Sequence, residues 1–275
     1  MILYYLLKRD LYLRFRDTMK MSTFLILLYT AIVFYCTWNQ LTAMNERHVS
    51  LSINFYKIFS GVDFINLAHF YKEGRLTFPF YWLFFQLIPL LALGHFTHSD
   101  IQKNGVYLLP RVRKKSLLWS SKMISLFVYT FVLWIVMYVI WFTLYFSLIN
   151  VLGSSSMSNN LFLSNILYTM AIQIIISYIL CLIYELFTLY MPSIIALSCL
   201  VTYLVGSVFI HSHYLLGSFV MPGRWYFVDH SPIQLTASHS HSIQYNEFFL
   251  VSFITFILIL IVSFLSFKKL DVIGD

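Results

Sequence analysis

The chain has 275 residues, of which 60% are hydrophobic and only 11% are charged. Soluble domains contain about 25% charged and about 45–50% apolar residues, so this composition excludes an ordinary water-soluble domain. The net charge of +7 at pH 7 accompanies long uncharged runs. It therefore indicates the sidedness of membrane spans and contact with anionic lipid, instead of nucleic-acid binding.

Residues 1–20 precede the first long apolar run and mix apolar with charged residues. Apolar side chains recur at i, i+4 spacing, at Leu3, Leu7, Leu11, Phe15 and Met19. Charged side chains fall on the other side, at Arg9, Arg16, Asp17 and Lys20. This pattern predicts an amphipathic helix that lies on the inner membrane surface. The alternative is an irregular basic tail.

Six later segments are long and apolar enough to cross a membrane, which takes about 20 helical residues. They are Ser22–Trp38, Phe78–Phe96, Met123–Leu148, Leu161–Tyr190, Pro192–Ile210 and Phe248–Phe267. Pro79 and Pro89 predict a kink or a break in the second segment. Pro192 predicts the break between the fourth and fifth, because proline disfavours helix at the preceding residue. The expected fold is an all-α polytopic membrane protein with six transmembrane helices.

Lysine and arginine are distributed unevenly between the connecting segments. With the N-terminus inside, thirteen of the 18 basic residues lie on the cytoplasmic side and five lie outside. This asymmetry follows the positive-inside rule, so the N- and C-termini are both expected to be cytoplasmic. Residues 97–122 then form the largest cytoplasmic loop, while residues 39–77 and 211–247 form extracytoplasmic segments.

Glu185 is the only acidic residue inside a predicted span. An acid within the membrane is a functional candidate by default. Glu185 lies close to the cytoplasmic end of an unusually long span. We therefore interpret it as half of a structural ion pair with a basic group near the inner face, and not as a proton relay.

Nine histidines raise the question of a metal site. His95 and His98 are expected inside, so they cannot join the histidines expected outside. Four of those outer histidines form two His-x-His pairs, at His211, His213, His239 and His241. Imidazole suits zinc or copper, so the alternative function is a membrane enzyme or sensor with an extracytoplasmic His-bound metal. The simpler interpretation is polar residues in a loop rich in Ser and Tyr, with no metal.

Motifs that carry enzymatic chemistry are absent from the chain. None of the nine glycines is followed by lysine, so no Walker A phosphate loop is present. The sequence also lacks a His-Glu-x-x-His zinc motif and a Gly-x-Ser-x-Gly nucleophile elbow. We therefore expect no catalytic residue and no cofactor on this chain.

Two stretches of sequence resemble the ABC-2 type permease, the membrane subunit of a bacterial ATP-binding-cassette exporter. The stretch entering the third span has Asp100, Gly105, Leu108-Leu109-Pro110-Arg111, Lys114, Trp119 and Lys122, and the tail reads Phe267-Lys268-Lys269-Leu270-Asp271-Val272-Ile273. The resemblance covers the whole chain by topology, as one transmembrane domain over residues 1–275. It implies an elbow helix at residues 1–20 and a coupling segment within residues 97–116. It also implies a homodimer or heterodimer of permeases in the bacterial plasma membrane.

The resemblance further implies that a separate cassette ATPase subunit binds ATP and Mg and docks on the coupling segment. We expect Ile101, Tyr107 and Leu108 to enter a groove of that ATPase. Three charged residues are expected at the rim of the contact, namely Asp100, Lys103 and Arg111. The chain alone then has transport function without enzymatic activity.

The cargo is expected to be an amphipathic peptide or a lipid-like molecule. Small Phe- and Tyr-rich permeases of this kind resemble those of Gram-positive bacteria that export, or confer immunity to, antimicrobial peptides. Aromatic spans with few charges suit such a cargo, because apolar groups need no buried ion pair. Lipid-linked polysaccharide export and drug efflux are the competing functions.

Overall fold

The computed structural model describes residues 2–43, 51–62, 78–93, 96, 100, 115–152, 160–210, 212, 214–224 and 245–269. These residues are helical or form short connections, and no strand occurs among them, so the predicted all-α fold class is confirmed. The helices are α1 (Ile2–Ala43), α2 (Leu51–Phe59), α4 (Phe80–Leu93), α6 (Lys115–Leu152), α7 (Asn160–Thr188), α8 (Ser193–Phe209), α9 (Leu216–Phe219) and α10 (Tyr245–Lys269), with a 3₁₀ turn η1 at Pro222–Arg224.

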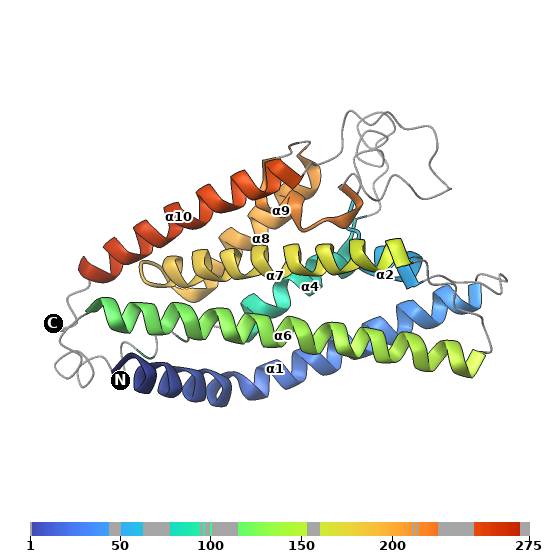
Figure 1. Cartoon of the computed structure of the whole chain (residues 1–275), viewed down its shortest axis with the longest axis horizontal. Coiled ribbons are helices and arrows are strands. Elements are labelled where there is room, and N and C mark those ends of the chain that lie inside the picture. Colours follow the sequence, from blue (N-terminus) through green and yellow to red (C-terminus); the bar gives the residue numbers. More distant parts are fainter. Residues whose placement is uncertain are drawn as a thin grey trace.

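The long helices lie side by side and alternate in direction (Figure 1). At one end, which we call the N end, α1, α6 and α8 begin and α4, α7 and α10 end (Figure 1). Toward the other end, which we call the far end, lie α2 and the starts of α4 and α7, while α9 and the start of α10 lie nearer the middle (Figure 1). The predicted break at Pro192 is present, because α7 ends at Thr188 and α8 begins at Ser193. Pro79 directly precedes α4, and Pro89 lies inside it.

Four of the described helices are long and apolar enough to cross a membrane. They are the helical stretches Leu3–Thr42, Lys115–Val151, Asn165–Thr188 and Asn246–Ser266. The other two predicted spans form shorter apolar helices, Phe80–Leu93 and Ser193–Phe209. At about 1.5 Å per residue, these two helices fall short of the ~30 Å hydrocarbon core. The described residues therefore support a multi-pass membrane protein and do not establish six spans.

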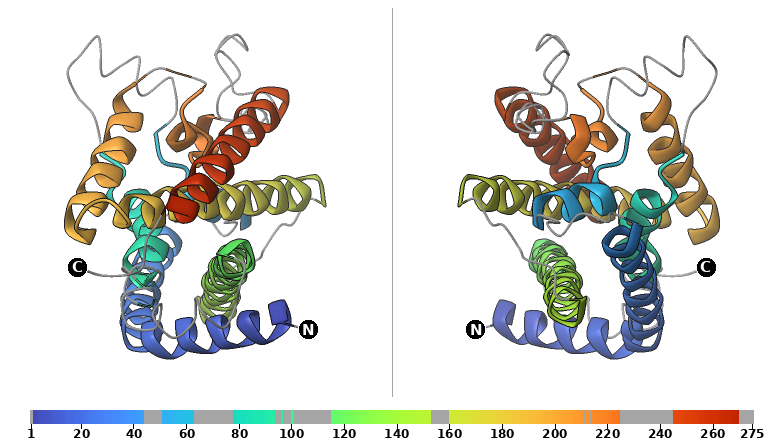
Figure 2. Two further views of the ribbon diagram at one scale, coloured as in Figure 1. Left: turned by 90° about the vertical axis from the view of Figure 1, so that its left-hand side faces the viewer. Right: turned by 90° about the vertical axis from the view of Figure 1, so that its right-hand side faces the viewer.

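Helix α1 contains both the predicted amphipathic helix and the first predicted span, as one continuous helix of 42 residues. Figure 2 shows that its N-terminal part runs across the direction of the rest. Thr18, Ser22 and Thr23 each donate a side-chain hydrogen bond to the backbone carbonyl four residues earlier, at 2.7–2.8 Å. Such bonds bend helices, and they lie where the amphipathic part meets the first apolar run.

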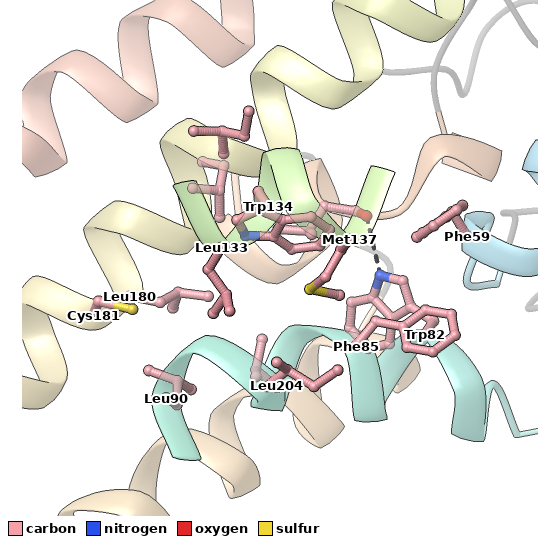
Figure 3. Close-up of a cluster of buried hydrophobic side chains, with 14 of the residues drawn as sticks. Phe59, Trp82, Phe85, Leu90, Leu133, Trp134, Met137, Leu180, Cys181 and Leu204 are labelled. Carbon is pink, nitrogen blue, oxygen red and sulfur yellow. Dashed lines mark hydrogen bonds between the residues drawn. The ribbon is translucent and has the colours of Figure 1, made fainter. Parts of the chain in front are cut away.

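Large aromatic side chains fill the centre of the bundle, where α4, α6 and α7 meet (Figure 3). Trp82, Phe85 and Trp134 are fully buried. The indole N–H of Trp82 donates to the carbonyl of Val220 at 3.0 Å, which ties α4 to the segment after α9 (Figure 3). Aromatic packing, together with the hydrogen bond of Trp82, holds the helices in register.

A buried arginine organises the far end. The Arg224 guanidinium donates to the carbonyls of Ser207 and Val208 at 3.0 and 2.9 Å, and to that of Val62 at 3.0 Å. The first two carbonyls belong to the last turn of α8, where a cation is favourable to the helix dipole. Arg224 therefore caps α8 and connects it to the segment that follows α2.

Candidate functional site

Six charged side chains come together at the N end of the bundle. This buried charge cluster consists of Arg9, Asp10 and Arg14 of α1, Asp100, Lys122 of α6 and Glu185 of α7. All except Arg9 are buried, with at most 5% of each residue exposed. The cluster holds three cationic and three anionic side chains, so their formal charges cancel. Charged side chains are almost never fully buried unless they are paired with an opposite charge.

Asp100 is the hub of the first half of the cluster. Its Oδ2 atom accepts a hydrogen bond from Arg9 Nη2 at 2.9 Å and a second one from the ammonium group of Lys122. Asp10 lies beside it, because Arg9 Nη2 also donates to Asp10 Oδ1 at 2.6 Å. Ser121 Oγ donates to Asp10 Oδ2 at 2.5 Å. The start of α6 is thus fixed to α1 and to Asp100 by charged hydrogen bonds, which are roughly twice as strong as neutral ones.

Arg14 and Glu185 form the second half of the cluster. Arg14 Nη1 donates to Glu185 Oε1 at 2.7 Å, which connects α1 to α7. The other carboxylate oxygen, Oε2, is buried and has no hydrogen-bond partner among the described residues. The two halves meet at Phe96, because the Arg14 guanidinium lies 4.7 Å from its ring centroid and the Lys122 nitrogen 5.5 Å from it. Both distances fall within the range of cation–π attraction.

The α-helical repeat of α1 explains how its charges reach the interior. Leu6, Asp10, Arg14 and Thr18 are buried and follow one another at i, i+4 spacing, so they share one face. The apolar stripe predicted from sequence is a different one, and its Phe15 and Met19 are exposed. The Asp10–Arg14 spacing was the available signal for the buried face. It was missed because an apolar stripe can face either lipid or the protein interior, and the pattern alone does not distinguish the two.

The chemistry of the cluster is that of a lock between helices. Removing one partner from a buried ion pair leaves an uncompensated charge, at a cost of about 3–5 kcal/mol. Four segments of the chain therefore cannot separate at this end without exposing or rearranging charges. The six members of the cluster include no thiol and no histidine. Their arrangement suits mechanical coupling between helices.

The structure describes only part of the predicted coupling segment. Asp100 was expected at the rim of the contact with the ATPase. In the structure only 5% of it is exposed, and two cations hold it. Its position in the cluster is due to its contacts with Arg9 and Lys122. The sequence spacing of these residues does not predict that they meet. The remaining members, Ile101, Lys103, Tyr107, Leu108 and Arg111, lie outside the described residues, so their predicted role stays a prediction.

The predicted outer metal ligands cannot be placed either. His211, His213, His239 and His241 all lie outside the described residues. Within the part of the chain that the structure describes, no group of three or more His, Cys, Asp or Glu side chains is arranged to hold a metal ion. The His-bound metal alternative therefore gains no support and stays a hypothesis. Glu185 is placed, with Arg14 as its basic partner.

The chain belongs to a protein family known as DUF2705, described as a protein of unknown function, whose model matches residues 24–273. No curated protein matches the chain, and no solved structure does.

Proposed function

We propose that this chain is the transmembrane permease subunit of an ATP-binding-cassette exporter of the ABC-2 type. In this proposal, a separate ATPase subunit hydrolyses ATP and the membrane chain moves an amphipathic peptide or lipid-like cargo outward. The observation that carries the proposal is the position of Asp100. It lies within the predicted coupling segment, residues 97–116, and binds cations of both α1 and α6.

The proposed transmission of force follows from these contacts. A push on residues 97–116 reaches Asp100, and through Arg9 and Lys122 it reaches the N-terminal part of α1 and the start of α6. These two helices are the longest described and pack extensively against each other. The Arg14–Glu185 pair extends the connection to α7. Rigid helices joined by such pairs are suitable carriers of a conformational change.

The proposal includes six spans with both termini in the cytoplasm. In this proposal, the shorter apolar helices α4 and α8 cross the membrane in addition to the four long ones, and their directions alternate with those of the long helices (Figure 1). Nine of the basic residues in the described helices lie toward the N end, at Lys8, Arg9, Arg14, Arg16, Lys20, Lys115, Lys122, Lys268 and Lys269. Lys57 and Arg224 lie toward the far end. This asymmetry supports an inner position for the N end.

The test is co-purification of the tagged chain with the cassette ATPase from the native bacterium. We expect a stable complex, because the loop and the first part of α1 together offer enough surface for a standard interface of about 800 Å² per partner. Replacing Ile101 and Leu108 with Asp should abolish the complex, since charges would have to enter an apolar groove. A complex that survives both replacements would refute the coupling assignment.

A matched control distinguishes loss of contact from loss of folding. Tyr214→Asp changes an exposed aromatic residue between α8 and α9, away from the N end, where the ATPase is proposed to dock. This variant should co-purify with the ATPase as the wild type does. The Ile101→Asp/Leu108→Asp variant must also elute as a single species in size-exclusion chromatography, which shows that the membrane subunit is folded.

A further inference from the structure

A groove runs between α6, α7 and α10 on the outer surface of the bundle. Its volume is about 610 Å³, within the roughly 300–1,000 Å³ of typical ligand pockets. Ile179, Phe248 and Ser252 are buried at its floor, while Phe249 and Phe253 are exposed at its rim. The groove is almost entirely apolar, and its helices are candidate membrane spans, so lipid is the medium that faces it.

The groove has a polar and charged end. Trp119 lines it near the start of α6, and its indole N–H is buried without a hydrogen-bond partner among the described residues. Lys115 precedes Trp119 by one helical turn, so the two residues share a side of α6. Lys268 and Lys269 occupy the end of α10 at the same N end of the bundle. The apolar groove thus contains an unsatisfied donor near the end of the bundle where these three lysines occur in the chain.

The composition of the lining favours a flexible chain over a transmembrane helix. Helices pack closely in membranes through the small residues Gly, Ala, Ser and Thr, and twelve of the fourteen lining residues are larger than these. Ring contacts bound the groove at both ends, because Trp119 touches Phe264 at 5.6 Å between centroids and Phe219 touches Phe248 at 5.5 Å. Between these contacts the lining consists mostly of large apolar side chains, which suits a flexible acyl chain.

We propose that this groove is a binding site for an anionic glycerophospholipid. One acyl chain lies along the floor at Ile179 and Ser252. An ester oxygen accepts the hydrogen bond of the Trp119 indole, and the phosphate lies at the N end, where α6 begins at Lys115 and α10 ends at Lys269. The proposal depends on the chain spanning a membrane and not on the exporter assignment, so it can fail or succeed independently of that function.

The test uses the purified full-length protein and phosphatidylglycerol that carries a diazirine on one acyl chain. After irradiation, mass spectrometry should locate the label on the α6 and α10 residues of the groove. Ser252→Phe fills the floor and Ile175→Trp fills the groove from α7, so each should lower labelling at least about tenfold, the factor given by about 1.4 kcal/mol. Two filling variants on different helices guard against misfolding of either one.

Ile254→Trp is the matched control, because Ile254 is exposed on α10 and does not line the groove. It should label as the wild type does. Phosphatidylcholine with the same diazirine should label more weakly, and the triple variant Lys115→Gln/Lys268→Gln/Lys269→Gln should remove that difference. Equal labelling of the filled variants, or label spread evenly over the exposed face of α10, would overturn the site. Equal labelling by both lipids would overturn its preference for anionic lipid.

Discussion

Arg14 of α1 and Glu185 of α7 form a buried ion pair, with 2.7 Å between Nη1 and Oε1, although 171 residues separate them in the sequence. The guanidinium side chain is fully buried and the carboxylate side chain is 5% exposed. The pair connects the N-terminal part of the first helix to the end of the fourth predicted span. It is therefore a long-range constraint on the fold as well as part of the proposed coupling path.

Glu185→Gln should destabilise the protein strongly. The substitution keeps the shape of the side chain but removes the carboxylate charge that pairs with Arg14, and breaking a buried ion pair costs about 3–5 kcal/mol. Thermal unfolding in detergent, followed by size-exclusion chromatography or fluorescence, measures the effect. Glu185→Lys should destabilise it further, because it places two like charges together.

An exposed pair on the same helix provides the control. Arg16 and Asp17 are bonded at 2.9 Å, but their side chains are 57% and 49% exposed. Surface ion pairs contribute about 0–1 kcal/mol, so Asp17→Asn should change the unfolding temperature little. Equal losses in Glu185→Gln and Asp17→Asn would contradict the structural role of the buried pair.

Asp100→Asn should loosen the attachment of the predicted coupling segment. The change removes the carboxylate that neutralises Lys122 and accepts from Arg9. We expect trypsin to cut the segment between residues 97 and 116 faster than in the wild type, because more of the chain separates from the bundle. The double variant Asp100→Asn/Lys122→Met should recover part of the protection, with a coupling energy of about 0.5–3 kcal/mol. Independent, additive effects would show that the two residues do not form the described pair.

Gly61→Ala should destabilise the far end. Gly61 has a φ of 70°, and a Cβ atom there would lie 2.7 Å from Met221 Cγ. A left-handed backbone costs about 1–2 kcal/mol for a residue with a Cβ, and the contact with Met221 adds to that cost. Gly206→Ala is the control, because a Cβ at Gly206 meets nothing within 4 Å inside α8. It should be neutral or stabilising by about 0.5–1 kcal/mol, as thermal unfolding would report. A Gly61→Ala protein as stable as the wild type would contradict the described turn.

Cysteine labelling tests the proposed orientation. Single cysteines at Ser155 and Ser238, in a protein whose Cys36, Cys181 and Cys199 are replaced, should react with an impermeant maleimide added to intact cells. A cysteine at Asn104 should react only after the cells are opened, because the positive-inside rule places it in the cytoplasm. Reaction of the Asn104 cysteine in intact cells would reverse the topology.

The helices were the most predictable part of the fold. The expected segment Leu161–Tyr190 became α7 at Asn160–Thr188, and Pro192–Ile210 became α8 at Ser193–Phe209. Hydropathy and proline determine such boundaries locally, so a single sequence contains the information. The lengths of α4 and α8 were less predictable. Their helices are shorter than the apolar runs that suggested them, because helix ends depend on tertiary contacts.

The charge cluster was largely unpredictable. Glu185 stood out as a lone acid in an apolar run, and the expected basic partner near the inner face is Arg14. The i, i+4 spacing of Asp10 and Arg14 was a weaker signal, and Asp100 gave none, since each aspartate lies in a stretch where charges are common. Their burial depends on contacts between segments up to 111 residues apart. Periodicity describes one helix at a time and does not identify the segment that packs against it.

Hydrolysis of ATP by the co-purified cassette ATPase, with the membrane chain reconstituted in lipid nanodiscs, tests the exporter proposal most directly. The wild-type chain should stimulate hydrolysis above the rate of the isolated ATPase. Ile101→Asp/Leu108→Asp should remove that stimulation, and Tyr214→Asp should preserve it. A membrane chain that leaves the hydrolysis rate unchanged, or stimulation that persists in the Ile101→Asp/Leu108→Asp variant, would contradict the proposed coupling through residues 97–116.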